Sequence, residues 1–309
     1  MNIRQLQIFK AICDAGSIVR AAEVERSAPS VLAHHLGNLE HRIGVPLLIR
    51  QSRGVTPNDA GKRLYAHATA ILRAIQLAEQ DMHESSSEIT GEVAIGMAYS
   101  SVRAIGSSLM ATVMRAHPKL RLTIAESLSG VTVERLLESE VDLAIAYNPS
   151  KDAQLQLTPL LEEKMVCIGR RDVIGDSPSP IRLDELTKMP YVLLRKGVQG
   201  RAVMDEARLQ KLLEQNARLY TDSVHAAQLF LKGGLGCMID SLANLNNLTG
   251  TKDLVSRPII APEIVRTLYL CELPDRPHSR AVQLIRELSL GMVKAEIEAG
   301  RWPCRSLLH

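Results

Sequence analysis

The stretch "SIVRAAEVERSAPSVLAHHLGNLE", residues 17–40, contains two helical patterns separated by a short break. Ser17 is a favourable N-cap for the first helix, and the small side chains of Ala21 and Ala22 allow another helix to approach closely. The chain turns between Ser27 and Ser30. A second apolar stripe then follows at helical spacing, formed by Val31, Leu32, Leu36, Leu39 and Ile43. Two helices joined by so short a turn predict a helix-turn-helix.

The flanking segments extend this pattern. A further helical pattern precedes the quoted stretch and ends at Gly16. After the stretch, residues 47–50 and 54–56 predict two short strands around a basic turn. Such a wing would place Arg50 and Arg53 against a minor groove or a phosphate backbone.

Beyond the wing, the sequence predicts a long amphipathic helix. Thr56 is its predicted cap, Pro57 occupies the first helical position, and the helix continues to about Glu84. A helix of ~40 Å with an apolar stripe and no local partner usually pairs with a second copy of itself. The polar segment 83–91 then serves as a linker.

Composition and charge narrow the class of protein. The 309 residues suffice for two or three domains, and 46% hydrophobic with 23% charged residues are globular values. No apolar run reaches the ~20 residues that span a bilayer, so we expect a cytoplasmic protein with no membrane partner. Residues 1–65 carry a net charge of +4, whereas the remainder carries −1. This asymmetry favours a polyanion as the partner of the amino-terminal part.

The five cysteines are odd in number, far apart and without CxxC spacing, which argues against a zinc site or a disulfide framework. We expect buried free thiols, with a redox pair of Cys167 and Cys237 as the open alternative. The sequence predicts no metal site and no cofactor. The segment "GGLG" at 233–236 lacks GxGxxG and is interpreted as a turn between a helix and a strand.

From Glu92 onward, strand-like runs alternate with helical patterns, which predicts parallel βαβ units. The first series has strands at 93–97, 120–125 and 141–146 and helices at 102–115 and 131–139. The second series has strands or helices at 164–169, 191–194, 203–214, 218–220, 224–232 and 237–239. A crossover near 157–161 joins the two series, and a strand at 267–271 and a helix at 279–299 close the chain on the first. Two α/β lobes joined in this way would enclose a cleft.

The chain resembles LysR-type transcriptional regulators over nearly its whole length. The resemblance rests on "LQIFKAICDAGSIVRAAE" at 6–23, "LEHRIGVPLLIRQSRGVTPNDAGKRLYAHATAIL" at 39–72 and "GEVAIGMA" at 91–98. Its most specific part is "LLIRQSRGVTPNDAGKRLYAHA" at 47–68. This part and "LLESEVDLAIAY" at 136–147 are similar to the nitrogen-assimilation-control subgroup of the family.

The resemblance implies an α/β protein with an all-α amino-terminal part. A winged helix-turn-helix DNA-binding domain would occupy residues 1–58, and a long linker and dimerisation helix residues 59–90. Residues 91–309 would form an effector-binding domain with two α/β lobes, like type 2 periplasmic binding proteins. The lobes would comprise about 91–160 with 266–309, and about 161–265. The usual assembly of the family is a homotetramer, built from homodimers, on two DNA half-sites.

Candidate DNA contacts lie in and beside the helix-turn-helix, from about Ile18 to Gly37. Polar side chains of its second helix can reach base edges, and basic side chains of the wing can reach phosphates. The candidates are Arg20, Pro29, Ser30, Ala33, His34, His35, Asn38, Arg50 and Arg53. A solvated helix face is the alternative interpretation of the two histidines. Relatives often have glutamine, serine and arginine where this chain has Pro29, Ala33 and His34, so their base preference does not carry over.

Candidate ligand contacts lie where strands end and helices begin, because free amides at a helix N-terminus favour a carboxylate. Ser100 and Ser101 occupy one such junction and Ser129 the next, although serine there is often only an N-cap. The resemblance adds Tyr147, Gln199, Gly200 and Arg201. Where relatives have a Leu-Pro-Glu-Ser segment, "GGLGCMIDSLANL" at 233–245 lacks the proline and contains Asp240.

These features predict a sequence-specific DNA-binding regulator, not an enzyme, that responds to a small anionic metabolite such as a carboxylate bound between the lobes. Its partners would be double-stranded promoter DNA, the effector, further copies of the chain and, for an activator, RNA polymerase. One alternative is a regulator of this family that needs no effector. Another is a two-lobe enzyme or transport binding protein with a basic amino-terminal extension. No Ser/His/Asp arrangement, P-loop or metal-spacing cluster supports the enzyme.

Overall fold

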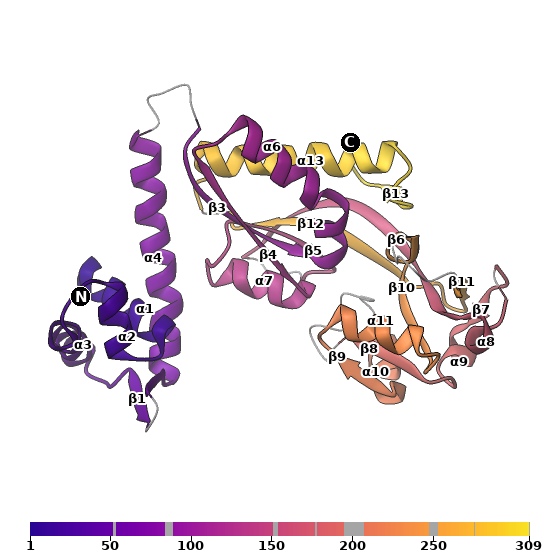
Figure 1. Cartoon of the computed structure of the whole chain (residues 1–309), viewed down its shortest axis with the longest axis horizontal. Helices are drawn as coiled ribbons and strands as arrows, with labels where there is room; N and C mark the ends of the chain where they lie inside the picture. Colours follow the sequence, from indigo (N-terminus) through magenta and orange to yellow (C-terminus); the bar gives the residue numbers. More distant parts are fainter. Residues whose placement is uncertain are drawn as a thin grey trace. The chain divides into compact units, whose positions relative to one another are not determined.

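The computed structural model describes residues 1–51, 54–83, 89–150, 154–176, 178–194, 207–246, 253–274 and 276–308. The chain divides into two compact units, each with its own hydrophobic core (Figure 1). The first unit comprises Met1–Ser87 with Glu138–Glu140, and the second comprises Glu88–Leu137 and Val141–His309. Among the described residues, no helix combines the length and the apolar character needed to cross a membrane.

The first unit begins with three helices, whose ends follow from local sequence signals. They are α1 (Ile3–Ala15), α2 (Ile18–Val24) and α3 (Pro29–Ile43). A capping box between Asn2 and Gln5 starts α1, and Gly16, with a left-handed φ of 61°, ends it. The Ser17 hydroxyl accepts a hydrogen bond from the Arg20 amide at the start of α2. The predicted stop and cap are therefore confirmed.

The three helices pack around one apolar cluster, and the predicted close approach at the two alanines is confirmed. Ala21 is fully buried and Ala22 nearly so, where α2 meets its neighbours. The buried face of α3 is formed by Leu32, Leu36 and Leu39. Val31 and Ile43, which the spacing assigned to the same stripe, are instead 43% and 38% exposed. Val31 lies about 100° around the helix axis from Leu32, and Ile43 is the last residue of α3.

The wing consists of two antiparallel strands, β1 (Leu48–Gln51) and β2 (Gly54–Pro57). The Val55 amide donates a hydrogen bond to the Gly16 carbonyl at 2.9 Å, so the wing is attached to the turn between α1 and α2. Gly54 has a φ of 140°, and a Cβ there would lie 2.3 Å from the Gly16 oxygen. Only glycine therefore fits this close approach.

The long helix α4 (Asp59–His83) follows the wing directly. The predicted cap at Thr56 is wrong, because Pro57 is the last residue of β2 rather than the first of the helix. Asn58 caps α4 instead, and its side-chain oxygen accepts a hydrogen bond from the Gly61 amide at 2.8 Å. Asparagine is a stronger N-cap than threonine, and the end of a strand tolerates a proline.

The apolar stripe predicted for α4 is partly buried against the first unit and partly exposed to solvent. Ala68 is fully buried, and Leu64 and Leu72 pack partly against the cluster formed by α1–α3. Ile71 is 38% exposed, and Ala78 is exposed as well. Part of the stripe therefore holds the helix against the first unit, and part of it faces solvent.

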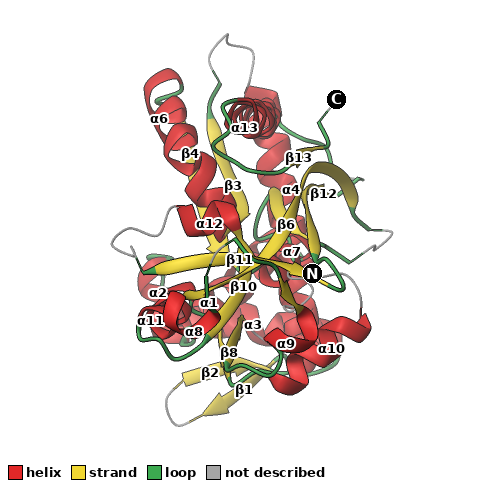
Figure 2. Ribbon diagram, turned by 90° about the vertical axis from the view of Figure 1, so that its right-hand side faces the viewer, coloured by secondary structure: helices red, strands yellow, loops and turns green. Residues whose placement is uncertain are grey.

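The first lobe of the second unit contains the predicted parallel strands. They are β3 (Gly91–Ala98), β4 (Leu120–Ser127) and β5 (Leu143–Tyr147), in the order β4-β3-β5, with β12 (Val265–Glu272) antiparallel to β5. The helices are α5 (Tyr99–Ser101), a π-helical turn η1 (Val102–Gly106), α6 (Ser107–Ala116), α7 (Ser129–Leu137) and α13 (Arg280–Glu298). The closing helix α13 packs against β3, α6 and η1, as predicted (Figure 1, Figure 2).

One strand, β6 (Gln156–Arg170), belongs to both lobes. Residues 156–164 pair with β12 of the first lobe, and the remaining residues pair with β10 (Cys237–Ser241) and β11 (Leu254–Ile260) of the second. The predicted crossover between the lobes is therefore present, but it is a continuous strand that changes lobe near residues 164–165 rather than a separate connection at 157–161. The charged residues 162–164 interrupt the apolar pattern of the sequence without interrupting the strand.

The second lobe confirms the remaining long elements and adds short ones. The strand β8 (Tyr191–Leu194) and the helix α11 (Val224–Lys232) have the predicted bounds, and β9 (Leu219–Thr221) is shifted by one residue. The helix predicted at 203–214 corresponds to α10 (Ala207–Asn216), which ends two residues later, and its predicted start at 203–206 lies outside the described residues. The segment 233–236 is a turn, as expected. The elements not predicted are α8 (Arg171–Ile174), β7 (Ile181–Arg182), α9 (Leu183–Leu186), α12 (Leu242–Asn246), β11 and β13 (Arg305–Ser306). Most of these are too short to show a period.

Candidate functional site

The solvent face of α3 carries most of the predicted DNA contacts. The helix begins at Pro29, a first-turn position where the missing amide hydrogen costs nothing, so the preceding turn lies two residues earlier than predicted, at 25–28. Because the three leucines of α3 are buried, the opposite face is left to solvent. Its exposed candidates are Pro29, Ser30, Ala33, His34 and Asn38.

The structure distinguishes the two histidines of α3. The His34 ring is exposed, and its Nε2 lies 3.0 Å from the side-chain nitrogen of Asn38, one turn further along the helix. A neutral ring that carries its proton on Nδ1 accepts this hydrogen bond. His35 is half-buried, and its ring lies edge-on to that of His34 with the centroids 6.3 Å apart. The exposed polar pair of the helix is therefore His34 with Asn38.

Exposed basic side chains also lie on α2 and β1, the elements that precede and follow this helix in the chain. Arg20 on α2 and Arg50 on β1 are exposed, whereas Arg53 lies outside the described residues. In the described part of the first unit, no ion pair involves Arg20, Arg26, Arg42 or Arg50. By contrast, Arg4 pairs with Glu25 at 2.8 Å. Guanidinium groups without a carboxylate partner are suited to bind phosphate.

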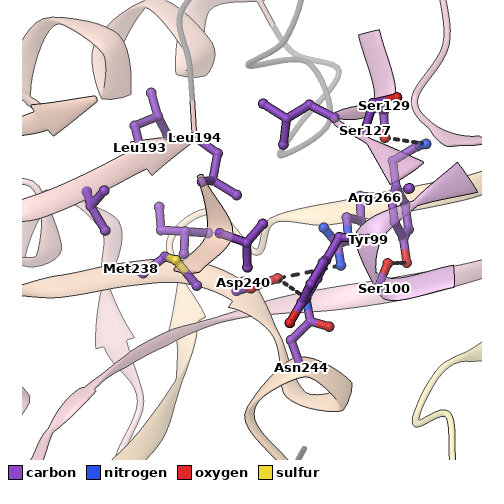
Figure 3. A pocket seen from close by; sticks show the side chains of 16 residues that line it. Tyr99, Ser100, Ser127, Ser129, Leu193, Leu194, Met238, Asp240, Asn244 and Arg266 are labelled. Atoms are coloured by element: carbon purple, nitrogen blue, oxygen red, sulfur yellow. Dashed lines mark hydrogen bonds and ion pairs between the residues drawn. The ribbon is translucent and has the colours of Figure 1, made fainter. Parts of the chain in front are cut away.

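The second unit contains a cavity between its two lobes (Figure 3). The centres of water molecules can occupy about 60 Å³ of it, several times the space that one bound water needs. One wall is apolar and belongs to the second lobe, with Val192, Leu193, Leu194, Met238 and Ile239. The other wall is polar and comes from strand ends of the first lobe, with Tyr99, Ser100, Ser127, Ser129 and Tyr147.

Three of the predicted ligand contacts meet at the polar wall. The Ser100 hydroxyl donates a hydrogen bond to the Tyr147 hydroxyl at 2.9 Å. The Tyr147 amide in turn donates to Oγ of Ser129 at 3.0 Å. Burial raises the pKa of Tyr147 well above its usual value, so this phenol stays neutral. The polar wall is thus fixed by its own hydrogen bonds.

The other predicted contacts do not join this group. Ser101 is fully buried, does not line the cavity, and its hydroxyl has no hydrogen-bond partner among the described residues. Consecutive residues on a helix point in different directions, so only one serine of the pair can face the cavity. Gln199, Gly200 and Arg201 lie outside the described residues.

Sequence reasoning missed a buried charged cluster beside the cavity. The Arg266 guanidinium donates from Nε to Glu163 at 2.9 Å and lies 3.8 Å from the centroid of the Tyr147 ring. Its Nη2 lies 3.6 Å from Oδ1 of Asp240. Trp302 donates from its indole nitrogen to the second oxygen of Glu163 at 2.8 Å. Asp240 and Arg266 line the cavity, and Glu163 lies behind them with no exposed surface.

Burial controls the ionisation of this cluster. It raises the pKa of Asp240 above its ordinary value, and the positive charge of Arg266 opposes that shift. Burial also disfavours the charge of Arg266, but Tyr147, Glu163 and Asp240 together raise its pKa. The guanidinium is therefore permanently charged, and the carboxyl of Asp240 loses its proton at a higher pH than an exposed aspartate does.

The alternation of inward and outward side chains along β12 could have indicated from the sequence that Arg266 is buried. Side chains two residues apart share one face of a strand. On this face Ile264, Leu268 and Leu270 are buried, and Arg266 occupies the alternate position between them. A charged residue at an inward position of an apolar strand needs a buried partner. That requirement points to the acidic residues of neighbouring strands.

The chain combines a winged helix-turn-helix, a long helix and a two-lobe α/β domain that contains a cavity. This combination defines the class of single-chain transcriptional regulators that have a DNA-binding and an effector-binding domain. The helix-turn-helix model of lysR-family bacterial regulatory proteins matches residues 3–62, and the LysR substrate binding domain matches residues 86–293. The chain belongs to the LysR family of transcriptional regulators. It is a regulator and not an enzyme, and its curated relatives are likewise named as regulators.

The relatives support this assignment over the full length. The nitrogen assimilation regulatory protein nac of Escherichia coli is 30% identical over 98% of this chain and 99% of its own, and that of Klebsiella aerogenes is 30% identical over 95% of each. The expected likeness to nitrogen-assimilation-control regulators is thus confirmed. A full-length OxyR variant of Pseudomonas aeruginosa shares the fold, with a TM-score of 0.70 and 18% identity over 95% of both chains. CbnR in complex with its target DNA has a TM-score of 0.64 and 15% identity, covering 96% of this chain and 99% of that one.

Proposed function

We propose that this regulator recognises promoter DNA through the solvent face of α3. The observation that carries the proposal is the exposed His34–Asn38 pair opposite the buried leucines of the same helix. An asparagine side chain can bond bidentately to adenine in the major groove, and the imidazole holds this one in place. Ser30 and Ala33 share the face, and Arg20 and Arg50 supply phosphate contacts. CbnR, which shares the fold, was solved in complex with its target DNA, which supports DNA as the partner.

The test measures affinity for the promoter between this gene and its divergently read neighbour, with random DNA as reference. Protonation of an imidazole near phosphates is favoured, and histidine titrates close to neutral pH. A protonated His34 keeps its pairing with Asn38 if the amide turns, so that the Asn38 oxygen accepts from Nε2. Binding should therefore tighten as the pH falls from about 8 to 6, a range in which arginines remain charged. His34→Gln should remove most of this dependence and the half-buried His35→Gln little of it. An identical pH dependence in all three proteins would exclude both histidines from the interface.

The proposed assembly is a homodimer formed through α4, and a homotetramer on two half-sites. The exposed part of the apolar stripe on α4, around Ile71, supports this pairing. Residues 1–58 would be the DNA-binding domain, 59–90 the linker helix, and 91–309 the effector domain, with lobes near 91–160 plus 266–309 and near 161–265. A cytoplasmic location is part of the proposal, because the proposed partner is promoter DNA, and an activator of this kind would also contact RNA polymerase.

The proposed regulatory input is a small molecule in the cavity of the second unit. The cavity combines an apolar wall with a few fixed polar groups, which is the usual composition of a ligand site. One observation favours the alternative of an effector-independent regulator: the polar wall and the charged cluster are bonded among themselves. Thermal-shift screening of metabolites separates the two, because only a ligand-responsive protein gains stability from a bound compound.

A further inference from the structure

The carboxylate of Asp240 has one oxygen without a partner on the cavity wall. Its Oδ1 accepts from the Ser241 amide at 2.7 Å and from the Asn244 side chain at 2.8 Å, and faces Arg266 at 3.6 Å. Within the described residues, no hydrogen bond reaches Oδ2. The side chain is 6% exposed and lines the cavity, where Figure 3 shows it apart from Ser129. A carboxylate oxygen without a partner on a cavity wall favours a ligand that donates to it.

The charge of the cluster points to the same kind of ligand. Glu163, Asp240 and Arg266 are 0%, 6% and 8% exposed, and two carboxylates surround the single guanidinium. Arg266 contacts Glu163, the Tyr147 ring and Asp240, but its buried Nη2 has no hydrogen-bond partner among the described residues, so it can still donate to an oxygen of the ligand. The net charge of the three side chains nevertheless stays negative. A ligand with only a carboxylate would add a further negative charge to this buried group, whereas an ammonium would neutralise one.

A donor for a ligand carboxylate exists elsewhere in the cavity. Oγ of Ser129 accepts from the Tyr147 amide, and its own hydroxyl hydrogen has no acceptor among the described residues. Ser129 is also the first residue of the nine-residue helix α7, whose amino-terminal end favours negative charge. The cavity therefore has an acceptor at Asp240 and a donor at Ser129, with the apolar wall of the second lobe beside them.

We propose that the cavity binds a small zwitterion of the α-amino acid class. This deepens the proposed ligand-responsive function and rests on it. The ammonium bonds to Oδ2 of Asp240, the carboxylate faces Ser129, and an apolar side chain packs against Leu193, Leu194 and Met238. The deaminated acid of the same amino acid satisfies only two of these three parts, because it lacks the ammonium.

The test uses the full-length protein with matched probes. The proteinogenic L-amino acids are compared with their deaminated acids and decarboxylated amines by thermal shift and calorimetry. For L-leucine, the matched compounds are 4-methylpentanoate and 3-methylbutylamine. We expect at least one amino acid to bind about 10- to 100-fold more tightly than its deaminated acid, the range for a hydrogen bond to a charged group.

Two variants connect the binding to the cavity. Asp240→Asn keeps the acceptor Oδ1 for Ser241 and Asn244 but removes the charge, so it should fold, retain DNA binding and lose that 10- to 100-fold preference. Asp253→Asn, an exposed aspartate of the second lobe, is the matched control and should bind like the wild type.

Three results would overturn the proposal. A deaminated acid that binds as tightly as its amino acid would leave a ligand-responsive regulator without an amine-binding site. Unchanged amino acid affinity in Asp240→Asn would place the ammonium elsewhere. No binding by any amino acid, with DNA binding intact, would remove the amino acid as the ligand, and the wider metabolite screen would then decide separately whether the regulator has a ligand.

Discussion

Oδ1 of Asp240 lies 3.6 Å from Nη2 of Arg266, within the range of an ion pair but beyond that of a hydrogen bond. The same guanidinium donates a hydrogen bond to Glu163 at 2.9 Å. Two buried carboxylates thus flank one cation with unequal contacts. Their removal should have unequal consequences.

Glu163→Ala should lower the free energy of unfolding by about 3 kcal/mol, the cost of leaving one member of a buried ion pair without its partner. The Trp302 indole loses its acceptor as well. Asp240→Asn should cost far less, because Arg266 keeps its bond to Glu163. Urea unfolding at pH 7, followed by the fluorescence of the single tryptophan, measures both. Equal losses in the two variants would contradict this ranking.

Asp240 should also make stability depend on pH. Burial raises the pKa of its carboxyl, so the folded protein keeps this proton at pH values where the unfolded chain, with an aspartate pKa of ~3.9, has lost it. Wild-type stability therefore falls as the pH rises from the unfolded pKa through the folded one. Asp240→Asn lacks this loss, so its stability relative to wild type should be lowest near pH 4 and increase toward pH 7. A relative stability that decreases over this range would contradict the shift.

Dimerisation should depend on Ile71 more than on its neighbour Leu72. Ile71 is 38% exposed, whereas Leu72 packs against the helices of the first unit. Ile71→Asp should therefore raise the dimer dissociation constant at least about tenfold, since it buries a charge in an apolar contact. Sedimentation of the full chain measures this constant. The control is Lys62→Asp, which also introduces an aspartate into α4 but lies on the opposite side of the helix axis from Ile71. An Ile71→Asp protein that stays dimeric would place the interface elsewhere.

The thiols should be unreactive in the native protein. Cys167, Cys237 and Cys271 have no exposed surface. Burial raises the pKa of Cys13 and Cys271 to about 12 and that of Cys304 to about 11. The pKa of Cys167 is raised as well, first by a hydrogen bond with Cys237 and then by burial. Only the thiolate reacts quickly.

Titration with a disulfide reagent at pH 8 tests this expectation. All five thiols should react at once after denaturation and slowly before it. A rapid native reaction, or a mass loss of two hydrogens after mild oxidation, would instead support the redox pair of Cys167 and Cys237.

The amino-terminal fold could be predicted because its signals are local. Gly16 ends a helix, Ser17 begins the next, and the paired alanines permit the crossing, all within eight residues. The cap of α4 was misplaced because Thr56 and Asn58 are both acceptable caps, and only the pairing of Pro57 in the wing decides between them.

The cavity was predictable only in part. Ser100 and Ser129 follow strands directly, so their position at the strand ends follows from the sequence order. Glu163, Asp240 and Arg266 come from three strands far apart in the chain, and no local pattern indicates that β6 pairs with both β10 and β12. The charged cluster is a product of this long-range pairing.

Recognition of DNA by the solvent face of α3 is the central claim, and selection of binding sites from a random duplex pool tests it most directly. Wild-type protein should enrich two related half-sites separated by a whole number of helical turns. Asn38→Ala should change the preferred base at one position of each half-site, a loss of about 1–3 kcal/mol in discrimination, and leave the other positions intact. Lys232→Ala, exposed on α11 of the second unit, should select the wild-type motif. Enrichment of the same motif by Asn38→Ala, or of no motif by the wild type, would contradict the account.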